Sequence, residues 1–182
     1  MISQNIERRM TRLIGLTNML RSGFTLVELI MVILILSIAA AMVLPMASSA
    51  GSIQLRAAAN MVAADLEYTK SMAISRGQAY SILFNKNNET YRVQDHNEVD
   101  ILHPVKKGLP YVVDFPHEGR LSRVTIDNVV FNGTSRVAFD YLGTPYDDNG
   151  ASLNAAGSVI LKAGGDTMTV KVEPVTGFIT VN

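Results

Sequence analysis

The sequence contains no cysteine, so it can form neither a disulfide framework nor a thiol active site. The chain also has no net charge, because its 16 basic and 16 acidic residues balance. Residues 1–23 hold four arginines and one glutamate, so the rest of the chain carries a net charge of −3. Bulk charge therefore does not indicate a protein that binds nucleic acid or another polyanion.

Patterns typical of enzymes are missing as well. There is no glycine-rich phosphate loop, nucleophile elbow or paired acid–base arrangement. Three histidines, His96, His103 and His117, lie in polar or proline-flanked stretches without the close spacing of metal ligands. We expect no catalytic residues, no metal and no cofactor.

One acidic loop leaves a metal alternative open. Asp147-Asp148-Asn149-Gly150 does not fit an EF-hand, because aligning Gly150 with the sixth position puts Pro145 first. A looser calcium site formed by Asp140, Asp147 and Asp148 remains an alternative to a simple turn-rich loop.

Residues 24–44 form a long apolar run without glycine, asparagine, aspartate or proline, and its one charge is Glu28. About twenty helical residues, each rising about 1.5 Å, span the hydrocarbon core of a bilayer. The preceding segment is basic, with Arg8, Arg9, Arg12 and Arg21. This flank predicts a single membrane span with a cytoplasmic N-terminus.

Glu28 is unexpected in such a helix, because a carboxylate costs about 2.5–3.5 kcal/mol near the centre of a membrane helix and less near its end. We interpret it as a functional charge with a partner. Two alternatives are a side chain that reaches the headgroups and a carboxylate that favours the positive N-terminal end of the helix dipole.

The stretch Gly23-Phe24-Thr25-Leu26-Val27-Glu28, followed by the apolar run, resembles the class III signal of type IV pilins and type II secretion pseudopilins. The resemblance implies that prepilin peptidase cleaves between Gly23 and Phe24 and that Phe24 is then N-methylated. Glu28 becomes the fifth residue of the mature chain. In the family such subunits assemble into a fibre, where the Glu28 carboxylate would pair with the terminal amine of a neighbouring Phe24.

Two other interpretations of the N-terminal region remain. A cleaved secretory signal would use the small residues at 47–50, although the apolar run exceeds the usual length of about 7–15 residues. An uncleaved anchor would leave a monotopic periplasmic protein.

The helix is expected to continue to Arg76 as one element from Phe24, with a kink at Pro45, which removes a helical hydrogen bond. Beyond residue 53, spacings of three and four define a stripe of small and apolar residues. The charged residues of this segment are expected outside the stripe. The stripe is Leu55, Ala58, Ala59, Val62, Leu66, Thr69 and Ala73, and the charged residues are Arg56, Asp65, Glu67, Lys70 and Arg76.

After Gly77 the apolar period changes to two, which predicts strands. Residues 78–85 and 90–94, joined by the turn 86–89, form a predicted hairpin. A polar loop is expected between residues 142 and 157. Further predicted strands are 111–115, 122–126, 136–140, 158–162, 168–172 and 178–181.

The second half of the chain is similar to GspH/FimT-type minor pseudopilins. The similarity rests on the order of the helix end 70–77, the hairpin, the segment 139–145, a glycine-rich strand pair and the C-terminal segment 173–179. It implies an α+β fold with a long N-terminal helix packed on antiparallel β-sheets. Lys70 stands where many members have arginine.

The chain is therefore predicted to consist of four segments: a cleaved leader (1–23), a transmembrane and polymerisation helix (24–50), an amphipathic helix (51–77) and a β-rich periplasmic domain (78–182). We expect a minor pseudopilin or pilin subunit in the bacterial inner membrane that joins a pseudopilus or pilus, with type II protein secretion as its function. The implied partners are prepilin peptidase, other pilin-like subunits and an inner-membrane assembly platform. The alternative is a DNA-binding minor pilin for DNA uptake, which would use Lys106, Lys107, Arg120 and Arg123.

Overall fold

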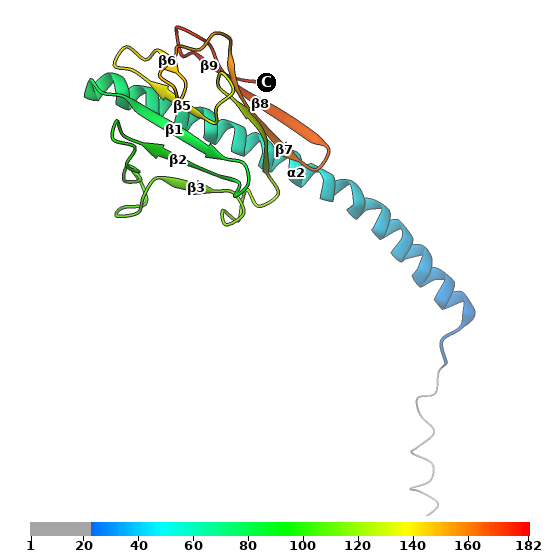
Figure 1. Cartoon of the computed structure of the whole chain (residues 1–182). Coiled ribbons are helices and arrows are strands. Elements are labelled where there is room, and N and C mark those ends of the chain that lie inside the picture. Colours follow the sequence, from blue (N-terminus) through cyan, green and yellow to red (C-terminus); the bar gives the residue numbers. More distant parts are fainter. Residues whose placement is uncertain (1–22) are drawn as a thin grey trace, which may run out of the picture. The chain divides into compact units, whose positions relative to one another are not determined.

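The computed structural model describes residues 23–182, and for residues 42–50 the backbone alone (Figure 1). All of the predicted leader (1–23) except Gly23 lies outside this range. Helix α2 (Leu26–Arg76) is a single element of 51 residues, as predicted, and starts two residues after Phe24. The chain divides into two compact units between Leu44 and Pro45, and each unit is described separately below.

The second unit is built on the part of α2 that follows Pro45. All seven residues of the predicted stripe are buried, and the six apolar ones form the core together with apolar side chains of the strands. Alanine at several of these positions lets the strands approach the helix closely. The helix ends at Arg76, where Gly77 adopts a φ of +63° and the Gln78 amide donates to Ala73 O over 3.2 Å.

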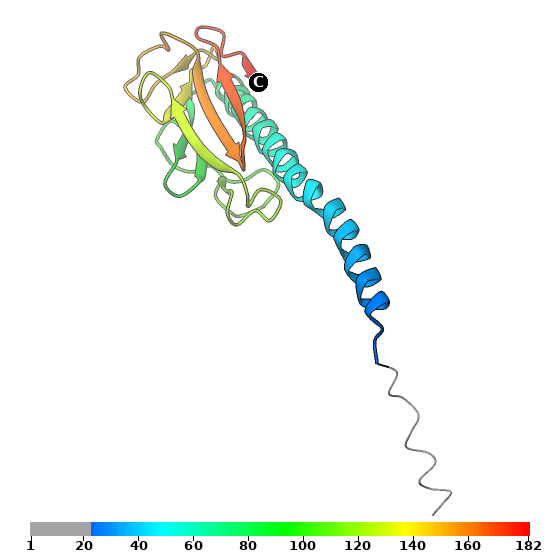
Figure 2. The same ribbon diagram turned by 90° about the vertical axis from the view of Figure 1, so that its right-hand side faces the viewer.

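Two antiparallel sheets pack on this part of the helix (Figures 1 and 2). The first has five strands in the order β3-β2-β1-β5-β6, and the second has four in the order β4-β7-β8-β9. The strands are β1 (Tyr80–Asn85), β2 (Thr90–Gln94), β3 (Val112–Asp114), β4 (Thr125–Val130), β5 (Arg136–Phe139), β6 (Pro145–Tyr146), β7 (Gly157–Ala163), β8 (Asp166–Val172) and β9 (Ile179–Val181). The predicted fold class, a helix packed on antiparallel sheets, is confirmed.

The predicted hairpin is present, with Phe84 opposite Tyr91 and Asn85 opposite Thr90. Two details of the strand prediction are wrong. The segment predicted at 122–126 begins at Thr125, because residues 121–124 form a turn in which the Val124 amide donates to Leu121 O over 2.8 Å. The loop expected between 142 and 157 also contains the short edge strand β6, which pairs with the end of β5.

Candidate functional site

The N-terminal segment leaves the predicted cleavage point outside the helix. Residues 23–25 are non-helical, and α2 begins at Leu26. Thr25 caps the helix, because its hydroxyl accepts a 3.2 Å hydrogen bond from the Glu28 amide, and its carbonyl accepts a 3.1 Å bond from the Leu29 amide. The peptide bond between Gly23 and Phe24 therefore precedes the first helical hydrogen bond.

Glu28 occupies the third position of the helix, and its side chain is exposed. Thr25 and Glu28 have the spacing of a capping box, in which an acidic residue also favours the positive end of the helix dipole. The helix-end alternative for Glu28 is thus compatible with its position. A carboxylate at this end of the helix still has oxygen lone pairs that can bind a cationic group.

The apolar side chains around Glu28 are exposed among the described residues of the first unit. Phe24 is 76% exposed, and the large apolar residues from Leu26 to Ile38 are all exposed. Soluble monomers rarely expose so many adjacent apolar side chains. In the part of the chain that the structure describes, no helix combines the length and the apolar character needed to cross a membrane.

Pro45 lies within α2, whose helical backbone continues through it. Its side chain is outside the described part of the structure, so the kink remains a prediction. The boundary between the two compact units falls immediately before this residue.

A buried carboxylate joins the helix to the first sheet. Asp65 accepts hydrogen bonds from the hydroxyls of Tyr91 on β2 (2.5 Å) and of Tyr111 just before β3 (2.7 Å). Burial raises the pKa of the Asp65 carboxyl, while the two tyrosines and the nearby His103 act in the opposite direction. Burial also raises the pKa of both tyrosines, so that they remain neutral donors.

The assignment of Asp65 to the charged positions outside the stripe is wrong, because its side chain is only 8% exposed. Its spacing of three from Val62 and four from Thr69 is the signal that places it on the buried face. The prediction missed this spacing because aspartate is normally exposed.

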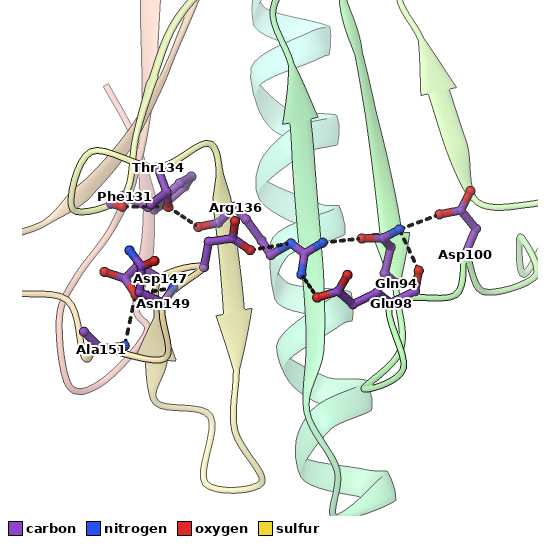
Figure 3. Close-up of polar contacts among 10 residues, drawn as sticks. Gln94, Glu98, Asp100, Phe131, Thr134, Arg136, Asp147, Asn149 and Ala151 are labelled. Carbon is purple, nitrogen blue, oxygen red and sulfur yellow. Dashed lines mark hydrogen bonds and ion pairs between the residues drawn. The ribbon is translucent and has the colours of Figure 1, made fainter.

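A second polar cluster centres on Arg136 of β5 (Figure 3). The guanidinium lies 2.7 Å from Glu98 through Nη1, donates to Gln94 Oε1 over 3.1 Å through Nη2, and lies 3.1 Å from Asp148 through Nε. The hydrogen bond from Arg136 lowers the pKa of Glu98. The cluster joins the β2–β3 loop to the loop after β6 and lines an open pocket of about 200 Å³.

Two of the acidic residues considered for calcium, Asp140 and Asp147, accept hydrogen bonds from backbone amides of their own loops. Asp147 Oδ1 accepts from the amides of Asn149 (2.8 Å) and Ala151 (3.0 Å), and these bonds lower its pKa. Asp140 Oδ1 accepts from the amides of Leu142 and Thr144. Within residues 23–182, no three histidine or acidic side chains group as a metal site. The calcium alternative therefore has no support in the geometry.

The comparisons with known proteins identify the family. Residues 58–176, more than half of the chain, match the family described as type II transport protein GspH, and residues 18–44 match the prokaryotic N-terminal methylation motif. The chain belongs to the GspH family. No curated protein matches this GspH-family chain.

Solved structures similar to this GspH-family chain include the type IV minor pilin FimU of Pseudomonas aeruginosa. One crystal form shares 17% identity and a TM-score of 0.49 over 72% of this chain and 90% of FimU. A second crystal form shares 18% identity and a TM-score of 0.46 over 70% and 92%. The minor pseudopilin EpsH from the type 2 secretion system of Vibrio cholerae shares 10% identity and a TM-score of 0.47, over 71% and 96%.

The family assignment confirms the resemblance to pilins and pseudopilins and the function expected from it. GspH proteins are membrane-anchored structural subunits of a pseudopilus and not enzymes. The alternative of a DNA-binding subunit has no support in these comparisons. One of its basic residues, Lys106, forms an ion pair with Glu118.

Proposed function

We propose that this GspH-family chain is a minor pseudopilin of a type II secretion system, cleaved between Gly23 and Phe24 and methylated on Phe24. The observation that carries the proposal is the order of two matches along one chain, the N-terminal methylation motif at 18–44 and the GspH domain at 58–176. The partners are prepilin peptidase, other pseudopilin subunits and the inner-membrane assembly platform.

The backbone around the cleavage point supports this processing. A peptide bond inside a helix is held by the surrounding hydrogen bonds, whereas the first helical amides have no partner within the helix. The Gly23–Phe24 bond precedes the Thr25 cap. A membrane peptidase can therefore bind it in extended form without unwinding α2.

Before assembly, the chain is a single-pass protein of the bacterial inner membrane with its β-rich domain in the periplasm. The exposed apolar residues from Phe24 to Ile38 fit a lipid environment first and a bundle of such helices later. The segments 1–23, 24–50, 51–77 and 78–182 then act as leader, membrane and polymerisation helix, amphipathic helix and periplasmic domain.

In the fibre, the Glu28 carboxylate pairs with the terminal amine of Phe24 in a neighbouring subunit. Cleavage creates this amine, so the pair can form only after processing. Removing either partner would leave an unpaired charge among apolar helices, at a cost of several kcal/mol. Pro45 gives α2 a point where it can bend when the helices bundle.

The test is the intact mass and N-terminal sequence of the full chain isolated from its own membranes. The proposal expects a start at methylated Phe24. A start at Met1 would indicate an uncleaved anchor, and a start beyond Ala47 would indicate a cleaved secretory signal. Either of these results would overturn the proposal.

The type of machine is tested by deleting the gene in the native host. Loss of protein secretion across the outer membrane, with twitching motility unchanged, is the expected result. Loss of twitching with normal secretion would assign the chain to a type IV pilus instead.

A further inference from the structure

Three segments meet at the end of α2 that is farther from Pro45. Lys70 donates a 3.0 Å hydrogen bond from Nζ to Gly177 O in the β8–β9 turn. A Cβ on Gly177 would lie 2.5 Å from Gly143 O in the β5–β6 turn, and one on Gly143 would lie 3.0 Å from Ile74 Cδ1 on the helix. The last turns of α2 and both β-turns are therefore in direct contact.

Large apolar side chains are exposed across these three segments. We define the apolar end patch as Ile74, Tyr141, Leu142, Val175 and Phe178, each between 49% and 73% exposed. Clusters of exposed apolar side chains are uncommon on soluble monomers, and where they occur they are often functional.

Val175 adopts a backbone conformation that a β-branched residue rarely accepts. Its φ is +66°, in the left-handed region, and its side chain is 73% exposed. Strain of this kind persists where the surrounding structure enforces it, and it is concentrated at functional positions. The hairpin bonds from Glu173 N to Phe178 O and from Gly177 N to Glu173 O enforce the turn here.

The opposite end of the same unit has a different character. There the β1–β2 turn consists of Lys86, Asn87, Asn88 and Glu89, and the β7–β8 turn of Gly164 and Gly165. Ala163 lies against Gly51, near the end of this unit where its part of the helix begins. Ile53 on the helix is an exposed apolar side chain at this end (69%), but both turns beside it are polar or glycine. A second copy stacked along α2 would thus offer a largely polar surface to the apolar end patch.

We propose that the apolar end patch binds the periplasmic domain of a different fibre subunit, one that presents an apolar surface of its own. The proposal rests on the proposed function, because it needs the chain to be in the fibre. Ile74 places the patch on α2, the same helix whose residues 24–50 are the proposed assembly segment. Axial stacking of subunits in the fibre brings a neighbouring domain to one end of each domain. The polarity of the opposite end disfavours an identical subunit as that neighbour.

The absence of cysteine allows a direct test in the full-length chain, because one introduced thiol is the only one present. Leu142→Cys within the patch and Asn87→Cys in the opposite turn are each labelled with a benzophenone maleimide in native membranes and irradiated. Both positions are exposed. The expected product is an adduct between Leu142→Cys and another processed subunit, identified by mass spectrometry. Its yield should be roughly tenfold higher than the yield at Asn87→Cys, a ratio that corresponds to about 1.4 kcal/mol.

Each other outcome overturns the proposal. A product of twice the mass of the chain would indicate a second copy, and a lipid adduct would indicate a membrane surface. Equal yields at the two positions would indicate no preferred surface. If the chain is in the purified fibre but Leu142→Cys gives no subunit adduct, only this inference fails. If it is absent from the fibre, the proposed function fails as well.

Val175→Asn provides a second test, because asparagine accepts the left-handed conformation and lacks the apolar side chain. In chains that also carry the Leu142→Cys label, we expect the melting temperature to rise by a few degrees while the subunit adduct falls several-fold. A rise in both stability and adduct yield would show that Val175 does not contribute to binding.

Discussion

The hydroxyl of Tyr91 donates a 2.5 Å hydrogen bond to the carboxylate of Asp65, and both side chains are buried between strand β2 and helix α2. Tyr111 donates to the other oxygen of the same carboxylate. The β2–β3 edge of the first sheet is thus attached to the helix by one shared acceptor as well as by apolar packing.

Tyr91→Phe removes one of these two donors and keeps the ring. We expect the free energy of unfolding to fall by about 1–3 kcal/mol, because the buried carboxylate loses a partner and no water replaces it. Urea denaturation of the full chain in detergent measures the change. Tyr141→Phe is the control, since Tyr141 is 61% exposed and its variant should unfold as the native chain does. Equal effects of the two changes would contradict the role assigned to Asp65.

The pH dependence of stability should carry the signature of Asp65. Burial raises the pKa of this carboxyl in the folded chain above its unfolded value of 3.8, so the folded state binds more protons between the two values. Its contribution to stability is therefore complete below pH 4 and declines as the pH rises toward the folded pKa.

Asp65→Asn removes this titration. The difference in melting temperature between the native chain and Asp65→Asn should shrink as the pH rises above about 4 and then become constant. Differential scanning calorimetry from pH 3.5 to pH 8 measures it. Glu67→Gln, an exposed carboxylate two residues further along the helix, serves as the control and should show no such change. A difference that grows with pH would show that the hydrogen bonds outweigh burial.

Gly177→Ala should be strongly destabilising, because the new Cβ would lie 2.5 Å from the backbone oxygen of Gly143 and the residue has a φ of +57°. Gly164→Ala is a matched control, with a φ of +63° and no atom within 4 Å of the new Cβ. The control should lose about 1–2 kcal/mol from the left-handed conformation alone, and Gly177→Ala at least about 1 kcal/mol more from the steric conflict. Thermal unfolding of both variants gives the difference. Similar losses would mean that the contact between the two turns is easily relaxed.

Glu28→Gln keeps the size of the side chain and removes its charge. We expect this chain to be inserted and cleaved normally but to enter fibres poorly, because the terminal amine of the neighbouring subunit lacks its counter-charge. The measurement is the ratio of chain in sheared fibres to chain in membranes. Glu67→Gln, on the same helix in the globular unit, should leave this ratio unchanged. Normal incorporation of Glu28→Gln would support the helix-dipole alternative.

The sequence predicted the larger part of the fold because its periodic signals are local. Spacings of three and four placed Leu55, Val62 and Leu66 on the buried face, and alternation found most strands. It missed the short strand β6, since Pro145 and Tyr146 are too few to show a period. It also placed the start of β4 too early, where the turn at 121–124 decides the boundary.

What the sequence indicated by itself is the N-terminal methylation motif that includes Gly23–Glu28, the long helix and the positions of most strands along the chain. These depend on neighbouring residues, so they can be read in the linear order of the chain. Only the tertiary structure decided that Asp65 is buried, that Arg136 lies among Glu98, Gln94 and Asp148, and that the last turns of α2 meet two distant turns at an apolar end. Such contacts join residues that are far apart in the chain. A charged residue such as Asp65, expected at the surface, can be buried because hydrogen-bond donors from distant segments satisfy it.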